Sequence, residues 1–254
     1  MSAASLSQKN RITGGLVDRD QPLGFRFDGQ HYTGFAGDTL ASALLANDVR
    51  LVGRSFKYHR PRGILTAGSE EPNALVTIGD GAFQDPNSRA TTAQLFNGMN
   101  EKSQTKMGLL SFDLMAVTDF LSPLLGAGFY YKTFMWPAAF WEKIYEPIIR
   151  KAAGLGSLSG LADPDQYDKG YLHCDLLVIG SGPSGLMAAL ASAKSGLQII
   201  LADEDFCLGG RLNAERQEID GMESAAFAAS CLAQLAAMDN VRILSKTTIF
   251  GAFD

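Results

Sequence analysis

The chain has 254 residues, a net charge of −5 and 46% hydrophobic residues, a composition typical of a globular protein of one or two domains. It excludes a disordered chain and disfavours a nucleic-acid binder that depends on an excess of basic residues. The three cysteines, Cys174, Cys207 and Cys231, have no C-x2-C spacing, so a disulfide framework is excluded and a metal site is not expected. Glycine makes up about 11% of the chain against a usual 7% or so, which indicates tight turns or backbone that approaches a ligand.

The sequence shows no signal for export or membrane insertion. The first ten residues are polar and lack the apolar core of a signal peptide. The longest apolar stretch, residues 109–141, is interrupted by Asp113, Asp119 and Lys132, whereas a spanning helix needs about 20 largely uncharged residues. We therefore expect a cytoplasmic protein that binds neither a membrane nor nucleic acid.

The first predicted elements form a small β-grasp domain over residues 1–90. Residues 23–32 alternate apolar and polar side chains around Asp28-Gly29, which predicts a β-hairpin with a two-residue turn. Asp38 is expected to cap a helix that continues to residue 46. A second alternation over residues 74–78 predicts a further strand.

This order of elements resembles the 2Fe–2S ferredoxin-like domains of amine-oxidising flavoenzymes, which place cluster cysteines as C-x4-C-x2-C directly before such a strand. The same frame here holds Thr66, Glu71 and Ala74, and residues 1–173 contain no cysteine. Iron–sulfur clusters need thiolates or, in a Rieske centre, two imidazoles. We therefore expect a ferredoxin-like scaffold without an iron–sulfur cluster; an unrelated β-grasp module is the alternative.

A basic run lies between Asp48 and Glu70, interleaved with aromatic residues and a histidine. One interpretation is a solvated loop. The other is contact with a phosphate or with an acidic surface of another subunit, because guanidinium groups hold phosphates through paired hydrogen bonds and stack on rings. The residues that would make such a contact are Arg54, Lys57, Arg60 and Arg62.

Residues 91–170 form an aromatic-rich connecting segment. Both tryptophans lie within residues 129–147, and this density of rings indicates a buried core or an interface, with the core favoured. Glycine, serine and Asp163-Pro164-Asp165 then predict a linker over residues 152–170.

Residues 171–254 carry a dinucleotide-binding pattern. An apolar strand over residues 174–179 leads into Gly180-Ser181-Gly182-Pro183-Ser184-Gly185, a helix of small residues follows, and a second strand over residues 198–201 ends at Asp203. Strand, glycines, helix, strand and acid in this order are typical of the first half of a Rossmann-type FAD/NAD(P)-binding domain. The fold class is therefore α+β followed by α/β, and we expect the second domain to be incomplete, ending in its third strand at residues 241–244.

Each position of the glycine pattern has a physical role. Gly180 permits the tight turn, Gly182 lets a pyrophosphate approach the backbone, and Gly185 lets the helix pack on the sheet. The helix N-terminus, with Pro183 and Ser184, supplies partial positive charge to that phosphate. Asp203, or Glu204 as the competing candidate, would accept hydrogen bonds from the ribose hydroxyls and disfavour a 2′-phosphate.

A Gly209-Gly210-Arg211 segment follows the acid. Such a segment is characteristic of flavoproteins with two dinucleotide-binding domains, where it lies near the adenosine side of the cofactor. Physically, Gly210 allows a close backbone approach and Arg211 could meet a phosphate. Cys207 in the same loop has no second cysteine nearby and is interpreted as a structural thiol.

Taken together, the chain resembles the N-terminal part of the α subunits of heterotetrameric sarcosine oxidases. The most specific parts are residues 54–65, RSFKYHRPRGIL, and residues 128–137, GFYYKTFMWP. The resemblance implies an oxidoreductase that demethylates sarcosine to glycine with O2, releases H2O2 and passes the one-carbon unit to tetrahydrofolate. It also implies β, γ and δ subunits as partners, FAD on the β subunit, FMN at the α/β interface near the basic run, and NAD in the Rossmann site of this chain.

We therefore expect a non-catalytic part of such a complex, with sarcosine and tetrahydrofolate bound elsewhere. No residue of this chain is assigned to catalysis or to a metal. Two alternatives remain: a subunit of a related amine, opine or hydroxyproline dehydrogenase with FAD in the Rossmann site, and a non-enzymatic scaffold module.

Overall fold

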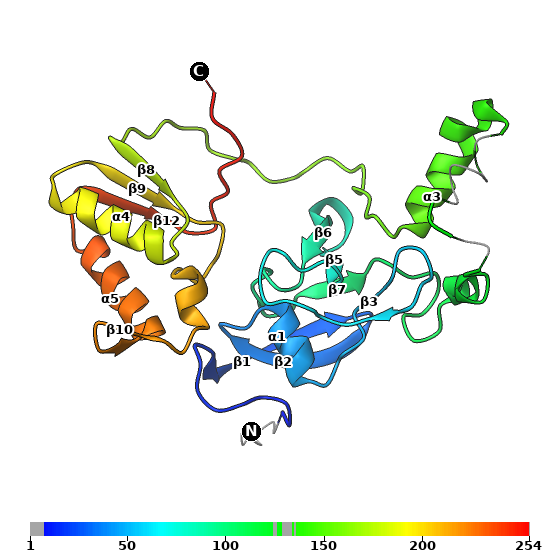
Figure 1. Ribbon diagram of the computed structural model, residues 1–254, viewed down its shortest axis with the longest axis horizontal. Helices are drawn as coiled ribbons and strands as arrows, with labels where there is room; N and C mark the ends of the chain where they lie inside the picture. The colour runs from blue at the N-terminus through cyan, green and yellow to red at the C-terminus, as the bar shows by residue number, and fades with distance from the viewer. Residues whose placement is uncertain (1–7, 124–125, 129–133, 135, 254) are drawn as a thin grey trace. The chain divides into compact units, whose positions relative to one another are not determined.

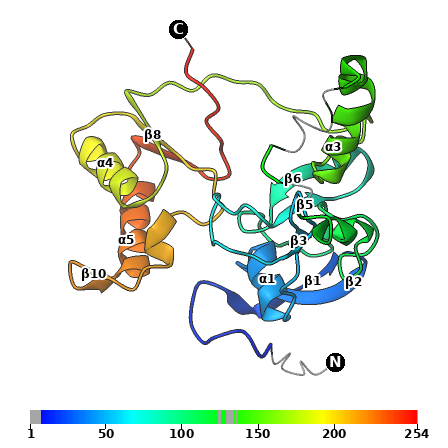
Figure 2. The same ribbon diagram turned by 45° about the vertical axis from the view of Figure 1, so that its right-hand side comes forward.

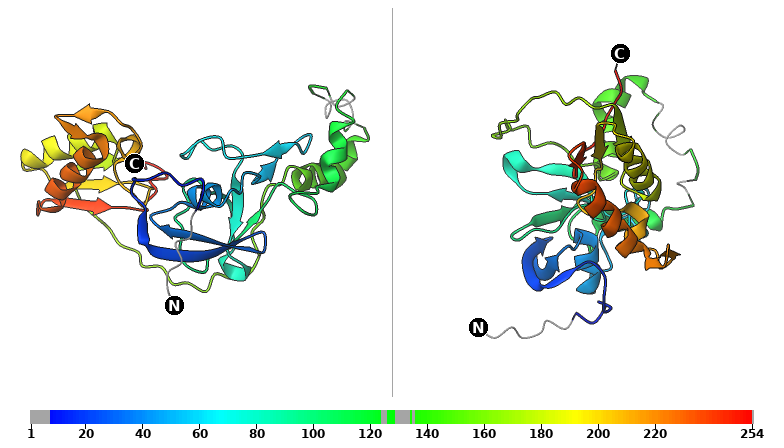
Figure 3. Two further views of the ribbon diagram at one scale, coloured as in Figure 1. Left: turned by 90° about the horizontal axis from the view of Figure 1, so that it is seen from below. Right: turned by 90° about the vertical axis from the view of Figure 1, so that its left-hand side faces the viewer.

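The computed structural model describes residues 8–123, 126–128, 134 and 136–253. It divides into two compact units, Met1–Asp165 and Gln166–Asp254, and each has its own apolar core. Figure 1 shows their elements. Between α3 (Glu146–Ala152) of the first unit and β8 (Leu176–Ile179) of the second, residues 153–175 contain neither helix nor strand (Figure 3).

The first unit is built on a five-stranded mixed sheet in the order β2-β1-β7-β5-β6. Its strands are β1 (Asp18–Phe27), β2 (Gln30–Ala36), β5 (Leu75–Ile78), β6 (Asp85–Arg89) and β7 (Asn100–Ser103). β1 pairs in parallel with β7 and antiparallel with β2, and the remaining pairs are antiparallel. The predicted hairpin is confirmed, because β1 and β2 meet at Asp28-Gly29 with Phe27 opposite Gln30.

Helix α1 (Leu40–Ala46) covers one face of this sheet (Figure 2). Its buried leucines pack with Phe25 and Phe27 of β1 and with Val76 of β5. This arrangement of a helix across a mixed sheet with a central parallel pair is the predicted β-grasp architecture. The sheet extends past the boundary expected at residue 90, because β7 lies between β1 and β5.

The cap of α1 differs from the sequence prediction. Thr39, not Asp38, is the N-cap, and it forms a capping box with Ser42. Asp38 is fully buried one residue earlier, where its carboxylate accepts hydrogen bonds from the Phe35 N–H (2.9 Å), the Ser42 hydroxyl (2.6 Å) and the guanidinium of Arg11. The acid therefore ties the turn before the helix to the N-terminal segment, a contact that local sequence spacing does not reveal.

The rest of the first unit consists of short elements. These are β3 (Gly53–Arg54) and β4 (Pro61–Arg62), the 3-10 turns η1 (Gly81–Phe83), η2 (Leu114–Asp119) and η3 (Ala138–Phe140), the π turn η4 (Trp141–Tyr145), and α3 (Glu146–Ala152). The expectation that the aromatic segment forms a core is wrong for its described tryptophans, since Trp136 is 83% exposed and Trp141 44% exposed. Much of the GFYYKTFMWP stretch lies outside the described residues.

The second unit is a three-stranded parallel sheet in the order β12-β9-β8. Its elements are β8 (Leu176–Ile179), α4 (Pro183–Lys194), β9 (Ile199–Ala202), η5 (Gly210–Asn213), the hairpin β10 (Glu218–Ile219) and β11 (Met222–Glu223), α5 (Ser224–Ala236) and β12 (Val241–Leu244). Helices α4 and α5 pack side by side against the strands (Figure 1). The predicted strands and helices of this unit are confirmed: the third strand lies at the residues expected, and the ends of the other elements differ by at most three residues.

Candidate dinucleotide-binding site

The glycine loop joins β8 to α4, and its three glycines meet different constraints. Gly180 has a φ of +92°, a left-handed conformation that only glycine adopts without strain. A Cβ added at Gly185 would lie 1.9 Å from the Gly180 carbonyl oxygen, so the close turn requires glycine there. Gly182 is different, because a Cβ there would meet no atom of the described residues within 4 Å. The space beside Gly182 is open to a ligand.

The N-terminus of α4 is not satisfied by the chain itself. Gly182 is its N-cap, no side chain caps it, and the first turn carries no acidic residue. Pro183 occupies the first turn, where its missing N–H costs no helical hydrogen bond, and Ser184 is exposed. Unpaired N–H groups and the helix dipole therefore present partial positive charge beside the open Gly182.

Ser181 organises this loop, although the sequence pattern assigned it no role. It is fully buried, and both its N–H (2.5 Å) and its hydroxyl (2.6 Å) donate to Oδ2 of Asp203. The Ser181 Oγ in turn accepts the Gly209 N–H at 2.9 Å. One side chain thus joins the glycine loop, the end of β9 and the Gly209-Gly210 segment. The G-x-G spacing leaves this position unspecified, so only the bonded partners identify it.

The two acids proposed for ribose binding have different surroundings. Asp203 is 9% exposed, and its second carboxylate oxygen accepts the Asp205 N–H at 2.8 Å. Its carboxylate is therefore held by the chain itself. Glu204, the next residue, is exposed. Of the pair, Glu204 is the acid that remains accessible to a ligand.

A cavity of about 320 Å³ lies at the carboxyl ends of the strands. Residues 179–180 after β8, residues 202–205 after β9 and residues 247–249 after β12 line it. Ligands of open α/β sheets bind at this end. Burial, and then the charges of Asp203 and Glu204, raise the pKa of Asp205. Because this wall is acidic, it suits hydroxyl groups of a sugar rather than a second phosphate.

The Gly209-Gly210 segment closes over the glycine loop. Gly209 and Gly210 both have positive φ, and a Cβ at Gly210 would lie 3.1 Å from the Cα of Gly182. Arg211 is exposed and pairs with Glu215 at 2.6 Å. Burial raises the pKa of the Cys207 thiol, which keeps it protonated, in line with the structural interpretation.

The basic run belongs to the first unit and is mostly held by internal bonds. Arg54 donates to the carbonyls of Leu110 (2.7 and 2.9 Å) and His59. Lys57 donates to the Gly126 carbonyl, and Arg60 pairs with Asp119 at 2.6 Å. Arg62 is exposed. Three of the four proposed contact residues therefore use their side chains to stabilise this segment. The exposed side chain of Arg62 is the most accessible of the four for contact with another molecule.

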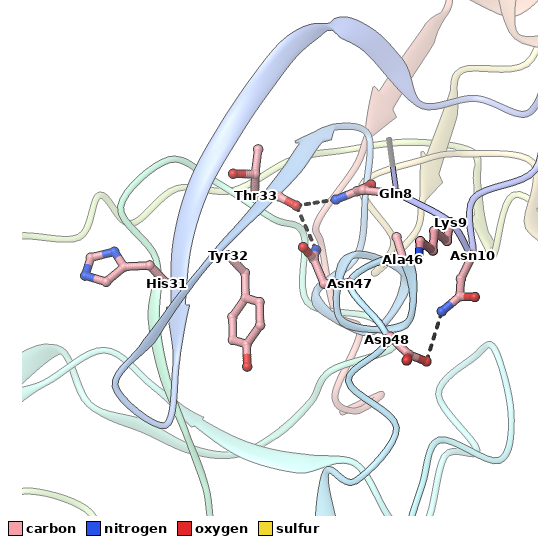
Figure 4. Close-up of a pocket in the computed structure, with 9 residues that line it drawn as sticks. All are labelled: Gln8, Lys9, Asn10, His31, Tyr32, Thr33, Ala46, Asn47 and Asp48. Atoms are coloured by element: carbon pink, nitrogen blue, oxygen red, sulfur yellow. Dashed lines mark hydrogen bonds between the residues drawn. The ribbon is translucent and has the colours of Figure 1, made fainter. Parts of the chain in front are cut away.

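The first unit contains a larger cavity of about 460 Å³, shown in Figure 4. Asn47 and Gln8 both donate to the Thr33 carbonyl, and Asn10 donates to Asp48 at 3.1 Å. These polar groups are paired with one another, and none of the predicted site residues lines the cavity. We assign it no ligand.

Within the described residues, no three His, Cys, Asp or Glu side chains gather in a way that could hold a metal ion. None of the described helices has both the length and the apolar character needed to cross a membrane.

A glycine loop with an open helix N-terminus, an acid after the second strand and a cavity at the strand ends are features typical of dinucleotide-binding α/β units. Comparison with family models agrees with this class: residues 175–247 match the FAD dependent oxidoreductase family. Residues 20–106 match the 2Fe-2S iron-sulfur cluster binding domain family.

Among curated proteins, sarcosine oxidase subunit alpha of Rhizobium meliloti (strain 1021) is 58% identical over 94% of this chain and 24% of that protein. Sarcosine oxidase subunit alpha of Corynebacterium sp. (strain U-96) is 35% identical over 96% of this chain and 21% of that protein. The chain spans about a quarter of the length of these relatives, or slightly less. The predicted resemblance to sarcosine oxidase α subunits is confirmed.

Among solved structures, L-proline dehydrogenase from P. horikoshii is similar with a TM-score of 0.53, covering 92% of this chain and 35% of that chain. Its sequence identity is 20%, so this likeness shows a shared fold.

The side chains of the first unit do not fit the cluster that its family model describes. The three positions of the cysteine frame hold Thr66, Glu71 and Ala74, none of which is a thiolate or imidazole. By contrast, the second unit offers what a dinucleotide needs: an open glycine loop, free helix N–H groups and an exposed acid.

Proposed function

We propose that the second unit binds NAD through the glycine loop and the N-terminus of α4. The observation that carries this proposal is the open space at Gly182, combined with a helix start that no side chain caps. The pyrophosphate would lie over Gly180, Gly182 and Gly185, with Ser184 and Gly210 beside it. Such a phosphate completes the donors that the chain leaves unpaired.

The ribose hydroxyls would meet the acidic end of β9. Glu204 is the accessible acceptor, and Asp203, with Ser181, positions the loop. Arg211 lies on the exposed rim, where it can reach a phosphate if its pairing with Glu215 opens. NAD supplies hydride chemistry when bound; the residues of this chain bind and orient it, and none is proposed to act on substrate.

FAD is the second candidate for the same site. The match of residues 175–247 to FAD dependent oxidoreductases favours it. Both cofactors share an ADP moiety, so the same residues would hold either one.

The complex proposed for this chain is a flavin-dependent sarcosine oxidase, supported by the similarity to sarcosine oxidase α subunits. In that proposal the complex converts sarcosine to glycine and H2O2 in the cytoplasm and transfers the one-carbon unit to tetrahydrofolate. FAD and FMN belong mainly to the β subunit, and the γ and δ subunits complete the assembly. The β-grasp unit then acts as a scaffold without an iron–sulfur cluster.

Partner contacts are proposed for two parts of the first unit. Arg62 is an exposed cation that could meet FMN or an acidic subunit surface. The segment with Trp136, Phe140 and Trp141 exposes large rings, and exposed rings of this size are frequent at protein interfaces. A subunit of a related amine, opine or hydroxyproline dehydrogenase would use the same surfaces.

The test is Gly182→Val in the full chain, titrated by calorimetry with NAD, NADP and FAD. We expect the variant to lose binding of the preferred cofactor while its thermal unfolding stays unchanged, because a Cβ at this position meets no atom of the described residues within 4 Å. Gly170→Val is the matched control, since Gly170 also has open space and lies outside the site. Unchanged affinity in Gly182→Val would overturn the assignment, and tighter binding of FAD than of NAD would select the second candidate.

A further inference from the structure

Residues 65–74 of the first unit form a loop around a buried carboxylate. Glu71 is 2% exposed. Its Oε2 accepts the N–H groups of Leu65 (2.8 Å) and Thr66 (2.6 Å), and its Oε1 accepts those of Asn73 (2.8 Å) and Ala74 (3.3 Å). Four backbone donors from both sides of the loop thus converge on one side chain.

The position of this carboxylate coincides with the cysteine frame of ferredoxin-like domains. The frame places its three residues at Thr66, Glu71 and Ala74, and the match of residues 20–106 to the 2Fe-2S cluster binding family covers all three. Glu71 occupies the middle position, and the first and third positions donate their N–H groups to it. Iron–sulfur clusters are themselves anionic groups that accept backbone N–H bonds.

From this geometry we infer that the Glu71 carboxylate replaces an iron–sulfur cluster as the anion around which the loop folds. The loop keeps the inward N–H groups of a cluster-binding loop, and a side chain of the same loop satisfies them. The first unit is therefore a structural domain that holds this loop closed without metal and carries no electrons.

The electrostatics of Glu71 agree with this role. Burial alone would raise the pKa of Glu71, but the hydrogen bonds from Thr66, Asn73, Leu65 and Ala74 outweigh it and lower the pKa below its usual value of 4.5. A carboxylate that accepts several backbone N–H bonds stays ionised in this way. The loop is anchored to the core at the same point, because Ala74 is fully buried and leads into β5.

The first test compares Glu71→Gln with Glu70→Gln in the full chain. Glu70 is the exposed neighbour and makes a matched control. We expect Glu71→Gln to lower the midpoint of thermal unfolding of the first unit by about 5 °C or more, because charge-assisted bonds to buried N–H groups are lost. Equal midpoints for the two variants would overturn the inference.

A second test uses the unaltered chain and does not depend on a variant that folds. Folding lowers the pKa of Glu71. Its carboxylate therefore stabilises the folded state above pH 4.5, and this stabilisation is lost as the pH falls through the pKa that Glu71 has in the folded state. We expect the amides of residues 65, 66, 73 and 74 to be protected from hydrogen exchange at neutral pH and to lose protection only below pH 4.5. If these amides are unprotected at neutral pH, the loop N–H groups are not bonded to the Glu71 carboxylate and the inference is wrong.

The third test offers the chain ferric iron and sulfide, with a thiol present, under anaerobic conditions. We expect no visible cluster absorbance and no uptake of iron and sulfide in equal, stoichiometric amounts. Stoichiometric uptake that is lost when residues 65–74 are altered would show that the loop holds a cluster, and the inference would be wrong. None of these results depends on nucleotide binding, so they leave the proposed function of the second unit to its own test.

Discussion

The two units each contain a loop of inward backbone N–H groups, and the loops differ in what supplies the negative charge. In the first unit, Glu71 fills the loop with its own carboxylate. In the second, the glycine loop leads into a helix whose first turn has no acid and no side-chain cap. Asp203 binds that loop at Ser181, through the N–H and the hydroxyl of this residue. A loop that supplies its own anion is complete, whereas one that leaves its donors open can accept the anionic group of a ligand.

A second contrast lies inside the first unit, between two buried glutamates. Glu101 on β7 is fully buried like Glu71, but neither of its carboxylate oxygens has a hydrogen-bond partner within the described residues. Burial therefore raises the pKa of Glu101 to about 8. Hydrogen-bond donors, more than burial, decide whether a buried carboxylate is ionised.

The largest expected effect concerns the turn of the open loop. We expect Gly185→Ala to destabilise the second unit by about 3 kcal/mol or more, because the new Cβ would overlap the Gly180 carbonyl oxygen. Hydrogen exchange in β8 and β9 measures this, with the β1–β2 hairpin as internal reference. Gly182→Ala is the control, since its Cβ meets no atom of the chain, and equal protection in the two variants would contradict the close approach.

An intermediate effect is expected at Glu101. Because folding raises the pKa of Glu101, the folded state retains a proton that the unfolded state loses, and stability falls as the pH rises from about 5 to 8. We expect Glu101→Leu to remove most of this fall and to raise the free energy of unfolding at pH 8 by about 1 kcal/mol or more. Urea unfolding at several pH values measures it.

The control for this variant is Glu70→Leu, which removes an exposed acid of the same unit. It should leave the pH dependence unchanged. If Glu101→Leu retains the full pH dependence of the unaltered chain, the titrating group is another residue.

The smallest expected effect separates the two acids after β9. Glu204→Gln should weaken NAD binding by about three- to tenfold, because one charge-assisted hydrogen bond to a ribose hydroxyl becomes neutral. It should also reduce the preference for NAD over NADP. Calorimetric titration measures both, and unfolding should not change because Glu204 is exposed. Asp203→Asn is the comparison: we expect it to destabilise the glycine loop and to weaken the binding of NAD and NADP alike. If Asp203→Asn instead changes the preference for NAD over NADP, Asp203 and not Glu204 binds the ribose.

The alternations and glycine spacings were sufficient to predict most elements of both units. The hairpin around Asp28-Gly29 and the strand–loop–helix at Gly180 depend on neighbouring residues, so local patterns identify them. The cap of α1 departs from the local pattern: Thr39 caps the helix, and the Asp38 carboxylate bonds to Arg11, which lies 27 residues away. The density of rings in the aromatic segment favours a buried core, but Trp136 and Trp141 are exposed. Composition alone does not tell whether rings pack inside the unit or lie on its surface.

The same limit applies to the candidate site. The glycines and the two acids could be named from spacing alone, but Ser181 could not, because its importance comes from Asp203 and Gly209, which lie 22 and 28 residues away. The choice between NAD and FAD stays a prediction, since both share the ADP moiety that this pattern recognises.

The sequence by itself determined the order of elements, the glycine loop and the absence of cysteine ligands in residues 1–173. Only the tertiary structure decided which carboxylates are accessible and which are already bonded: Glu71 inside its loop, Asp203 beneath Ser181, Glu204 exposed, and Glu101 buried with no donor among the residues that the structure describes. The physical reason is that the ionisation and accessibility of an acid depend on donors and burial contributed by segments distant in the chain.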